Sequence, residues 1–166
     1  MTVKITKDRL PELARAVKLL TARQVMVGVP DETAGRPQVE GKRERINNAA
    51  LAYIHETGIP EKNIPPRPFL GPGIEGAKGR ILPRLKKAGE AALETGNVSA
   101  IDRALKAVGI IAQSAVQQKI INGPFVPLKP RTLAERRKRG NESDKPLVDT
   151  GQLFGAIKYV IRDRGK

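Results

Sequence analysis

Apolar residues recur every three or four positions in four stretches of the chain, a spacing that places them on one face of an α-helix. The first stretch begins at Leu10 and runs to about Thr21. The other three cover residues 46–57, 73–95 and 99–122, and the middle one of these contains Pro83. The pattern predicts four amphipathic helices, with a kink near Pro83 because a proline ring removes one helical hydrogen bond. A shorter, basic helix is predicted over residues 132–139.

Two segments alternate apolar and other residues with the period of a β-strand. The first covers residues 24–29, with valine at every second position, and the second covers residues 157–161. Strands this far apart, with helices between them, favour an α+β fold in which a small antiparallel sheet packs against about four helices. With 166 residues, we expect residues 1–166 to form a single domain.

Prolines dominate the segment between the second and third predicted helices, residues 59–72, which we call the strap. Because proline has no N–H to donate and a fixed φ, we expect the strap to be extended or polyproline-like. Residues 31–45 and 123–147 are rich in polar residues, Gly and Pro, and are expected to form extended loops or arms.

Several residues are of the types found at helix ends. Gly58 is expected to end the second helix, because glycine adopts the positive φ that a C-terminal cap often requires. The candidate N-terminal caps are Ser99 with Asp102, Thr132 with Glu135, and Asp149 with Thr150.

Composition narrows the possible chemistry. The chain has 31 Lys and Arg against 17 Asp and Glu, a net charge of +14, which indicates an anionic partner. It has no Cys and one His, His55, which excludes disulfides, thiolate sites and any site with two imidazoles. Only 3% of residues are aromatic, which disfavours base stacking. We expect a non-enzymatic protein without cofactor or metal, without a membrane span or secretory signal, and therefore cytoplasmic at synthesis.

Three short motifs point to binding or catalysis. Gly71, Gly73 and Gly76 fit the dinucleotide pattern, but the strap precedes them where a buried strand is needed. Gly76 to Gly79 fits the G-x-x-G clamp of KH domains, which leaves a nucleic-acid-binding module as an alternative. His55 begins an H-E-x-x-H pattern whose second His is absent, and we expect it on a helix surface.

The densest basic cluster lies in the predicted short helix and at the residue before it. We expect it to form a basic surface that contacts either a phosphate backbone or an acidic protein, the alternative being a solvated helix face. Its members are Arg131, Arg136, Arg137, Lys138 and Arg139.

Two stretches carry a more specific pattern. The first reads AYIHETG at residues 52–58 and continues as IPPRPFL at residues 64–70, and the second reads PLVDTGQL at residues 146–153. In this order they resemble the phage virion-morphogenesis or tail-completion proteins, also described as minor tail or head-tail joining proteins. The VMVGV segment at residues 25–29 is similar to that family's first strand. The chain departs from the family at residues 154–156, Phe-Gly-Ala, where members tend to have a polar or basic residue followed by serine.

The resemblance implies a structural protein of a tailed-phage virion, without catalytic residues or cofactors. It would assemble with copies of itself into a ring, sixfold in preference to twelvefold, at the head-tail junction (neck) or upper tail. Its partners would be neighbouring neck or tail proteins and, without sequence preference, the genomic DNA. It would be found in the virion, and in the host cytoplasm during assembly, with no membrane contact.

The residues expected to dock subunits or partners belong to the strap and to the turn before the last strand. A proline-rich segment has little entropy to lose on binding, which suits a rigid docking surface. The alternative is that the strap only covers one end of the core. The candidate docking residues are Ile64, Pro65, Pro66, Arg67, Pro68, Phe69, Leu70, Leu147, Asp149, Thr150 and Leu153.

Overall fold

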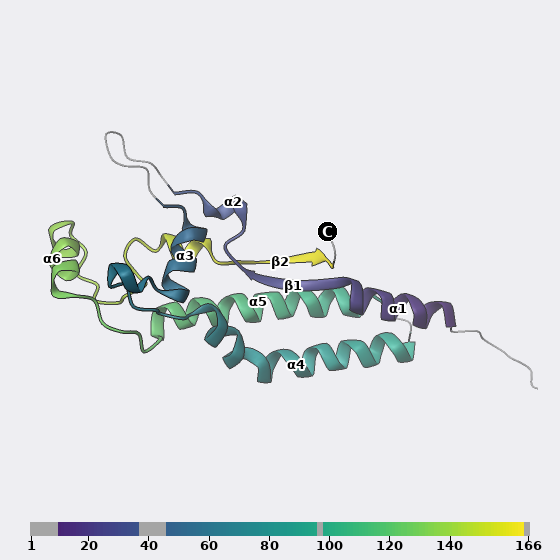
Figure 1. Cartoon of the computed structure of the whole chain (residues 1–166). Helices are drawn as coiled ribbons and strands as arrows, with labels where there is room; N and C mark the ends of the chain where they lie inside the picture. The colour runs from purple at the N-terminus through teal and green to yellow at the C-terminus, as the bar shows by residue number, and fades with distance from the viewer. Residues whose placement is uncertain (1–9, 37–45, 96–97, 165–166) are drawn as a thin grey trace, which may run out of the picture. The chain divides into compact units, whose positions relative to one another are not determined.

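The computed structural model describes residues 10–36, 46–95 and 98–164. The elements follow in the order α1 Leu10–Ala22, β1 Arg23–Gly28, α2 Asp31–Ala34, α3 Asn48–Thr57, the 3₁₀ turn η1 Pro60–Lys62, α4 Leu70–Thr95, α5 Val98–Asn122, α6 Pro130–Lys138, α7 Gln152–Ala156 and β2 Lys158–Asp163 (Figure 1). Strands β1 and β2 pair as a two-stranded antiparallel sheet, so the predicted α+β class is confirmed.

The chain divides into two compact units, each built from segments distant in the sequence. Among the described residues, one unit comprises 10–26, 78–95, 98–111 and 160–164, and the other comprises 27–36, 46–77 and 112–159. We call them the first and the second unit. The long helices α4 and α5 and both strands contribute residues to each.

The core of the first unit is small and aliphatic. Ala92 of α4 packs with Ile101 and Leu105 of α5, and Val25 and Ile161 of the two strands cover this cluster. The strands are also tied at their ends, because the Arg164 N–H donates to the Ala22 carbonyl. At the same end of the sheet, Arg23 forms an ion pair with Asp102 of α5 and lies 3.8 Å from Asp163.

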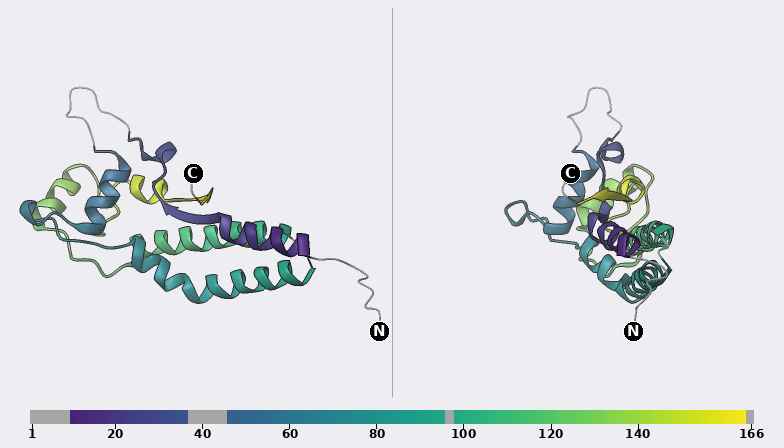
Figure 2. Two further views of the ribbon diagram at one scale, coloured as in Figure 1. Left: turned by 45° about the vertical axis from the view of Figure 1, so that its right-hand side comes forward. Right: turned by 90° about the vertical axis from the view of Figure 1, so that its right-hand side faces the viewer.

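The core of the second unit holds the larger side chains. Phe69, Val116, Ile120, Leu147, Leu153 and Ile157 are its buried members. Helices α4 and α5 come very close in this unit, because a Cβ on Gly73 would lie 2.8 Å from the Cα of Val116. The short helices α2 and α7 pack against α3 and against each other (Figure 2).

Several predicted helix starts are wrong, and each has a local reason. Helix α5 begins at Val98, one residue before the predicted Ser99 cap, and Asp102 pairs with Arg23 instead. Helix α6 begins at Pro130, whose fixed φ suits the first helical position, so Thr132 already lies inside the helix. Helix α7 follows Gly151, which has a φ of 75° and supplies no side-chain cap.

The loop predicted over residues 31–45 is partly helical. Residues Asp31–Ala34 form α2, in which Ala34 is buried, and residues 37–45 lie outside the described part of the chain. The arm predicted over residues 123–147 contains α6, which confirms the short basic helix predicted in this segment. None of the helices in the described residues is both long and apolar enough to cross a membrane.

Candidate docking site

The strap folds back against the end of α3. Gly58 has a φ of 76°, and its N–H donates to the Ile54 carbonyl, which confirms it as the cap of this helix. A Cβ at this position would lie 2.8 Å from the nitrogen of Pro66, so the close passage of the strap requires glycine. An antiparallel bridge between Ile59 and Ile64 then closes the turn around η1.

Glu56 fixes the other end of the strap. Its carboxylate accepts hydrogen bonds from the N–H groups of Phe69, Leu70 and Gly71, at 2.8, 3.0 and 3.1 Å. These are the amides at the start of α4, where the helix has unpaired donors and a partial positive charge. The IHETG and RPFL segments of the sequence pattern are therefore joined by the capping of a long helix.

Arg67 is a buried strap residue that holds the loop after α5. Its guanidinium donates to the carbonyls of Val126, at 2.9 Å, and Pro127, at 3.3 Å. Its own N–H donates to the His55 carbonyl. Burial and the nearby Arg136 lower the pKa of Arg67.

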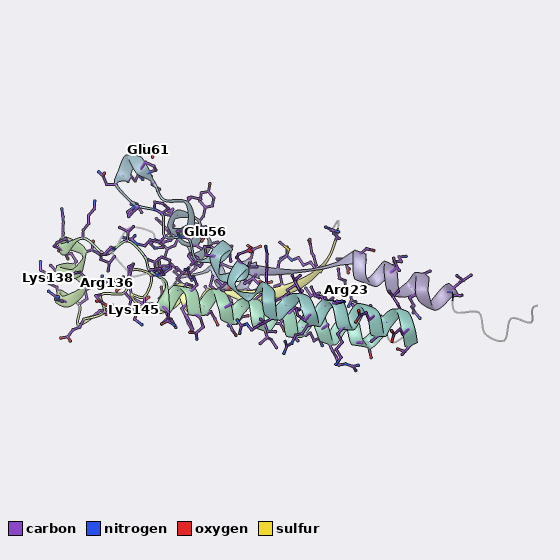
Figure 3. All side chains as sticks on the ribbon, turned by 90° about the horizontal axis from the view of Figure 1, so that it is seen from below. Arg23, Glu56, Glu61, Arg136, Lys138 and Lys145 are labelled. Carbon is purple, nitrogen blue, oxygen red and sulfur yellow. The ribbon has the colours of Figure 1, made fainter. Side chains whose placement is uncertain are left out.

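Arg136 organises the segment that follows α6. Its guanidinium donates to the carbonyls of Ser143, Lys145, Pro146 and Val148 at 2.8–3.2 Å. Its Nε lies 3.6 Å from the Asp149 carboxylate. Only 5% of its surface is exposed, and Figure 3 shows Arg136 beside Lys145 while Lys138 lies at the outer end of α6. Its predicted role as part of a basic surface is therefore wrong, because five acceptors of one turn surround it.

The PLVDTGQL turn is built on this arginine. Leu147 and Leu153 enter the core of the second unit, and the segment between them remains at the surface. Asp149 accepts from the Asn141 amide at 2.8 Å and pairs with Arg139 at 3.4 Å. The predicted capping of the following helix by Asp149 and Thr150 is wrong, since Asp149 instead closes the loop after α6.

The strap and this turn border one pocket of about 470 Å³ in the second unit. Its walls come from α3, the strap, the start of α6 and the PLVDTGQL turn. The two segments that carry the family resemblance are far apart in sequence, yet they face the same cavity. Of the predicted docking residues, those lining it are Ile64, Pro65, Arg67, Leu147, Asp149, Thr150 and Leu153.

His55 lies in the wall of this pocket. Its Nδ1 is buried and has no hydrogen-bond partner among the described residues. Burial, followed by the positive charges of Arg67 and Arg136, lowers the pKa of His55 from 6.5 to about 4. The imidazole is therefore neutral at pH 7, and the ring, predicted at a helix surface, is half-buried in the pocket wall.

The predicted docking residues differ in exposure. Phe69 is 1% exposed and is a core residue, so its assignment to docking is wrong and the core-covering alternative holds for it. Leu70 is half-buried and packs against the same core. Arg67, Leu147 and Leu153 are also buried, although they border the pocket. The predicted docking residues with half-buried or exposed side chains are Ile64, Pro65, Pro66, Pro68, Asp149 and Thr150, in addition to Leu70.

The remaining basic residues of α6 are at the surface. Arg131, Arg137, Lys138 and Arg139 are exposed, as predicted. Two of them have acidic neighbours, because Lys138 lies 3.5 Å from Glu135 and Arg139 lies 3.4 Å from Asp149.

The glycine motifs do not form binding loops. Gly73, Gly76 and Gly79 lie inside α4, where the backbone amides are engaged in the helix. A G-x-x-G clamp grips a nucleic-acid backbone from a loop between elements, and this segment has no such loop.

Some pocket residues had no signal in the sequence. Arg36, Lys62 and Lys129 contribute cations from three different segments, and Leu51 and Leu128 contribute apolar surface. None of them belongs to a motif, so only the fold brings them together.

Comparison of the chain with protein-family models, with curated proteins and with solved structures gave no match.

Proposed function

We propose that this chain is a non-enzymatic structural protein of a tailed-phage virion that assembles as a ring at the head-tail junction or upper tail. The observation that carries the proposal is the meeting of the strap and the PLVDTGQL turn at one pocket. The resemblance rests on these two segments, and a shared surface gives them a shared role. That role is the docking of neighbouring subunits and proteins.

The construction of the surface supports docking. The strap is held by Glu56, Gly58 and Arg67, and the turn is held by Arg136. A surface fixed in this way loses little conformational entropy on binding. Exposed apolar side chains of the same unit add contact area, notably Tyr53 at 70% and Val126 at 51% exposure.

The alternative is a nucleic-acid-binding module that uses the basic residues of α6. Light scattering on the purified chain, with and without duplex DNA, separates the two. The proposal expects oligomers of six or twelve times the 18.1 kDa chain mass without DNA. A monomer that forms only a salt-sensitive complex with DNA would contradict it.

A surface variant sharpens this experiment. Tyr53→Ser removes an exposed ring from α3 and should lower the oligomer fraction while leaving the melting temperature within the range of a surface change. Leu82→Ser is the matched control, because Leu82 is 59% exposed on the part of α4 that belongs to the first unit. Equal loss of oligomer in both variants would argue against assembly through the second unit.

A further inference from the structure

The pocket between the strap and the PLVDTGQL turn has an unbalanced charge. Its described walls carry one carboxylate, that of Asp149. The cations that face it are Arg36 after α2, Lys62 and Arg67 of the strap, and Lys129 and Arg136 at α6. Such convergence of one sign in a concave site attracts an anionic group.

The five cations are not equivalent. Arg67 and Arg136 are buried and donate to backbone carbonyls, so they supply positive potential but few donors to a ligand. Arg36 is half-buried and donates to Gln152 at 2.8 Å. Lys62 and Lys129 are exposed at the pocket wall and can turn their ammonium groups to an incoming anion.

The neutral wall of the pocket is suited to an apolar side chain. Leu51, Ile64 and Leu128 are half-buried and line the cavity. His55 adds an uncharged ring whose Nδ1 is buried without a partner among the described residues. A volume of about 470 Å³ accommodates a few side chains of an extended segment.

We propose that this pocket binds an acidic segment of a neighbouring protein, with a carboxylate between Lys62 and Lys129 and an apolar side chain against Leu51 and Leu128. This inference rests on the proposed docking function and names the chemistry of the partner. A second copy of the chain is a poor occupant, because each copy carries a net charge of +14. Duplex DNA is also a poor occupant, because evenly spaced phosphates require a row of exposed cations, and only Lys62 and Lys129 of the five cations at this pocket are exposed.

The single histidine makes the proposal directly measurable. His55 is the only histidine of the sequence, so its ring protons give one set of NMR signals that report on the pocket. The probe is the peptide acetyl-Leu-Glu-Leu-Asp-Leu-Glu-amide, and its control carries Gln and Asn in place of Glu and Asp. The acidic peptide should shift the His55 signals and raise the pKa of His55 by about one unit, since a nearby carboxylate favours the imidazolium. The neutral peptide should leave that pKa unchanged.

Matched variants distinguish binding of the acidic peptide at this pocket from its general electrostatic attraction to a basic protein. Lys62→Gln with Lys129→Gln should weaken acidic-peptide binding about fivefold, the scale expected for two exposed ion pairs. Lys18→Gln with Lys87→Gln removes the same charge from exposed positions outside the pocket and should leave the affinity unchanged. Equal weakening in both pairs, or no change at His55, overturns the proposal.

Three further outcomes are decisive. A twelve-base-pair duplex that shifts His55 and displaces the peptide would assign the pocket to nucleic acid and overturn the inference. Rings that form normally in a chain whose pocket ignores the acidic peptide would refute this inference and leave the proposed function standing. Peptide binding by a chain that never oligomerises would do the reverse.

Discussion

Arg136 shows how one side chain can define a surface without being part of it. It is flanked along α6 by other basic residues, yet it alone turns inward and binds four carbonyls of the segment 143–148. The exposed turn beside it, with Asp149, takes its shape from this contact. A variant meant to neutralise the basic surface of α6 should therefore keep Arg136.

We predict that Arg136→Met lowers the free energy of unfolding by about 3 kcal/mol, because buried carbonyls and Asp149 lose their donor. Arg137→Ala is the matched control, since Arg137 is exposed on the same helix, and it should change stability by less than about 0.5 kcal/mol. Urea unfolding of both variants checks this. Equal stability of the two would mean that the turn does not depend on Arg136.

His55 should make the stability of the folded chain depend on pH. Its pKa is about 4 in the folded chain and 6.5 as the ordinary value, so between these values the unfolded chain binds more protons. Stability should therefore rise as the pH increases from about 4 to 6.5 and level off above that range. Because the ring is partly exposed and screened, we expect a contribution of about 1–2 kcal/mol, less than the full shift implies.

The measurement compares urea unfolding of the wild type and His55→Gln at about pH 4.5 and pH 7.5. Carboxylates contribute equally to both proteins, so the difference between them isolates the histidine. The wild type should lose about 1–2 kcal/mol more than the variant at the lower pH. Identical pH profiles would show that the imidazole is not held neutral.

At the scale of the elements, the close crossing of α4 and α5 depends on one glycine. Gly73→Ala should destabilise the chain by about 1–3 kcal/mol, because the new methyl would press on the backbone of Val116. Gly76→Ala is the control on the same helix, with nothing within 4 Å, and should be neutral or stabilising by up to about 1 kcal/mol. Thermal unfolding distinguishes them. If Gly76→Ala were also destabilising, Gly76 would have to contact a neighbour, which contradicts the open space found around it.

Most elements could be predicted from periodicity, while their ends and the site could not. The long amphipathic helices and both strands were expected within a few residues of where they lie, because burial of one face repeats over several turns. The predicted caps failed where the carboxylate has another partner, since Asp102 pairs with Arg23 and Asp149 accepts a hydrogen bond from Asn141. Such partners are distant or loop-dependent, so spacing along the chain does not reveal them.

The residues that line the pocket were harder to predict from the sequence than the helices and strands. The strap and the PLVDTGQL turn were identified as important, but which of their residues face the pocket depends on Glu56, Gly58 and Arg136. Phe69 was expected to dock a partner because it belongs to the proline-rich strap, yet it fills the core. Nothing in the sequence distinguishes Lys62 and Lys129 from other lysines, and only the fold brings both to one cavity.

At the scale of the whole molecule, the proposed function makes two demands on one chain. It must present a rigid docking surface, and it must tolerate a net charge of +14 in an assembly. Acidic partners, or DNA passing the ring, would offset the repulsion between like-charged copies. A ring of this chain alone should therefore become more stable as the salt concentration rises, because screening weakens the repulsion.

The central claim is that the chain works as a ring-forming structural protein that docks through the strap side of its second unit. The most direct measurement is an electron-microscopy reconstruction of the purified assembly. We predict a closed ring in which Pro66, Pro68 and Thr150 lie at contacts with a neighbouring copy or protein. Single copies bound along DNA through α6, or a ring whose strap faces bulk solvent, would contradict the account.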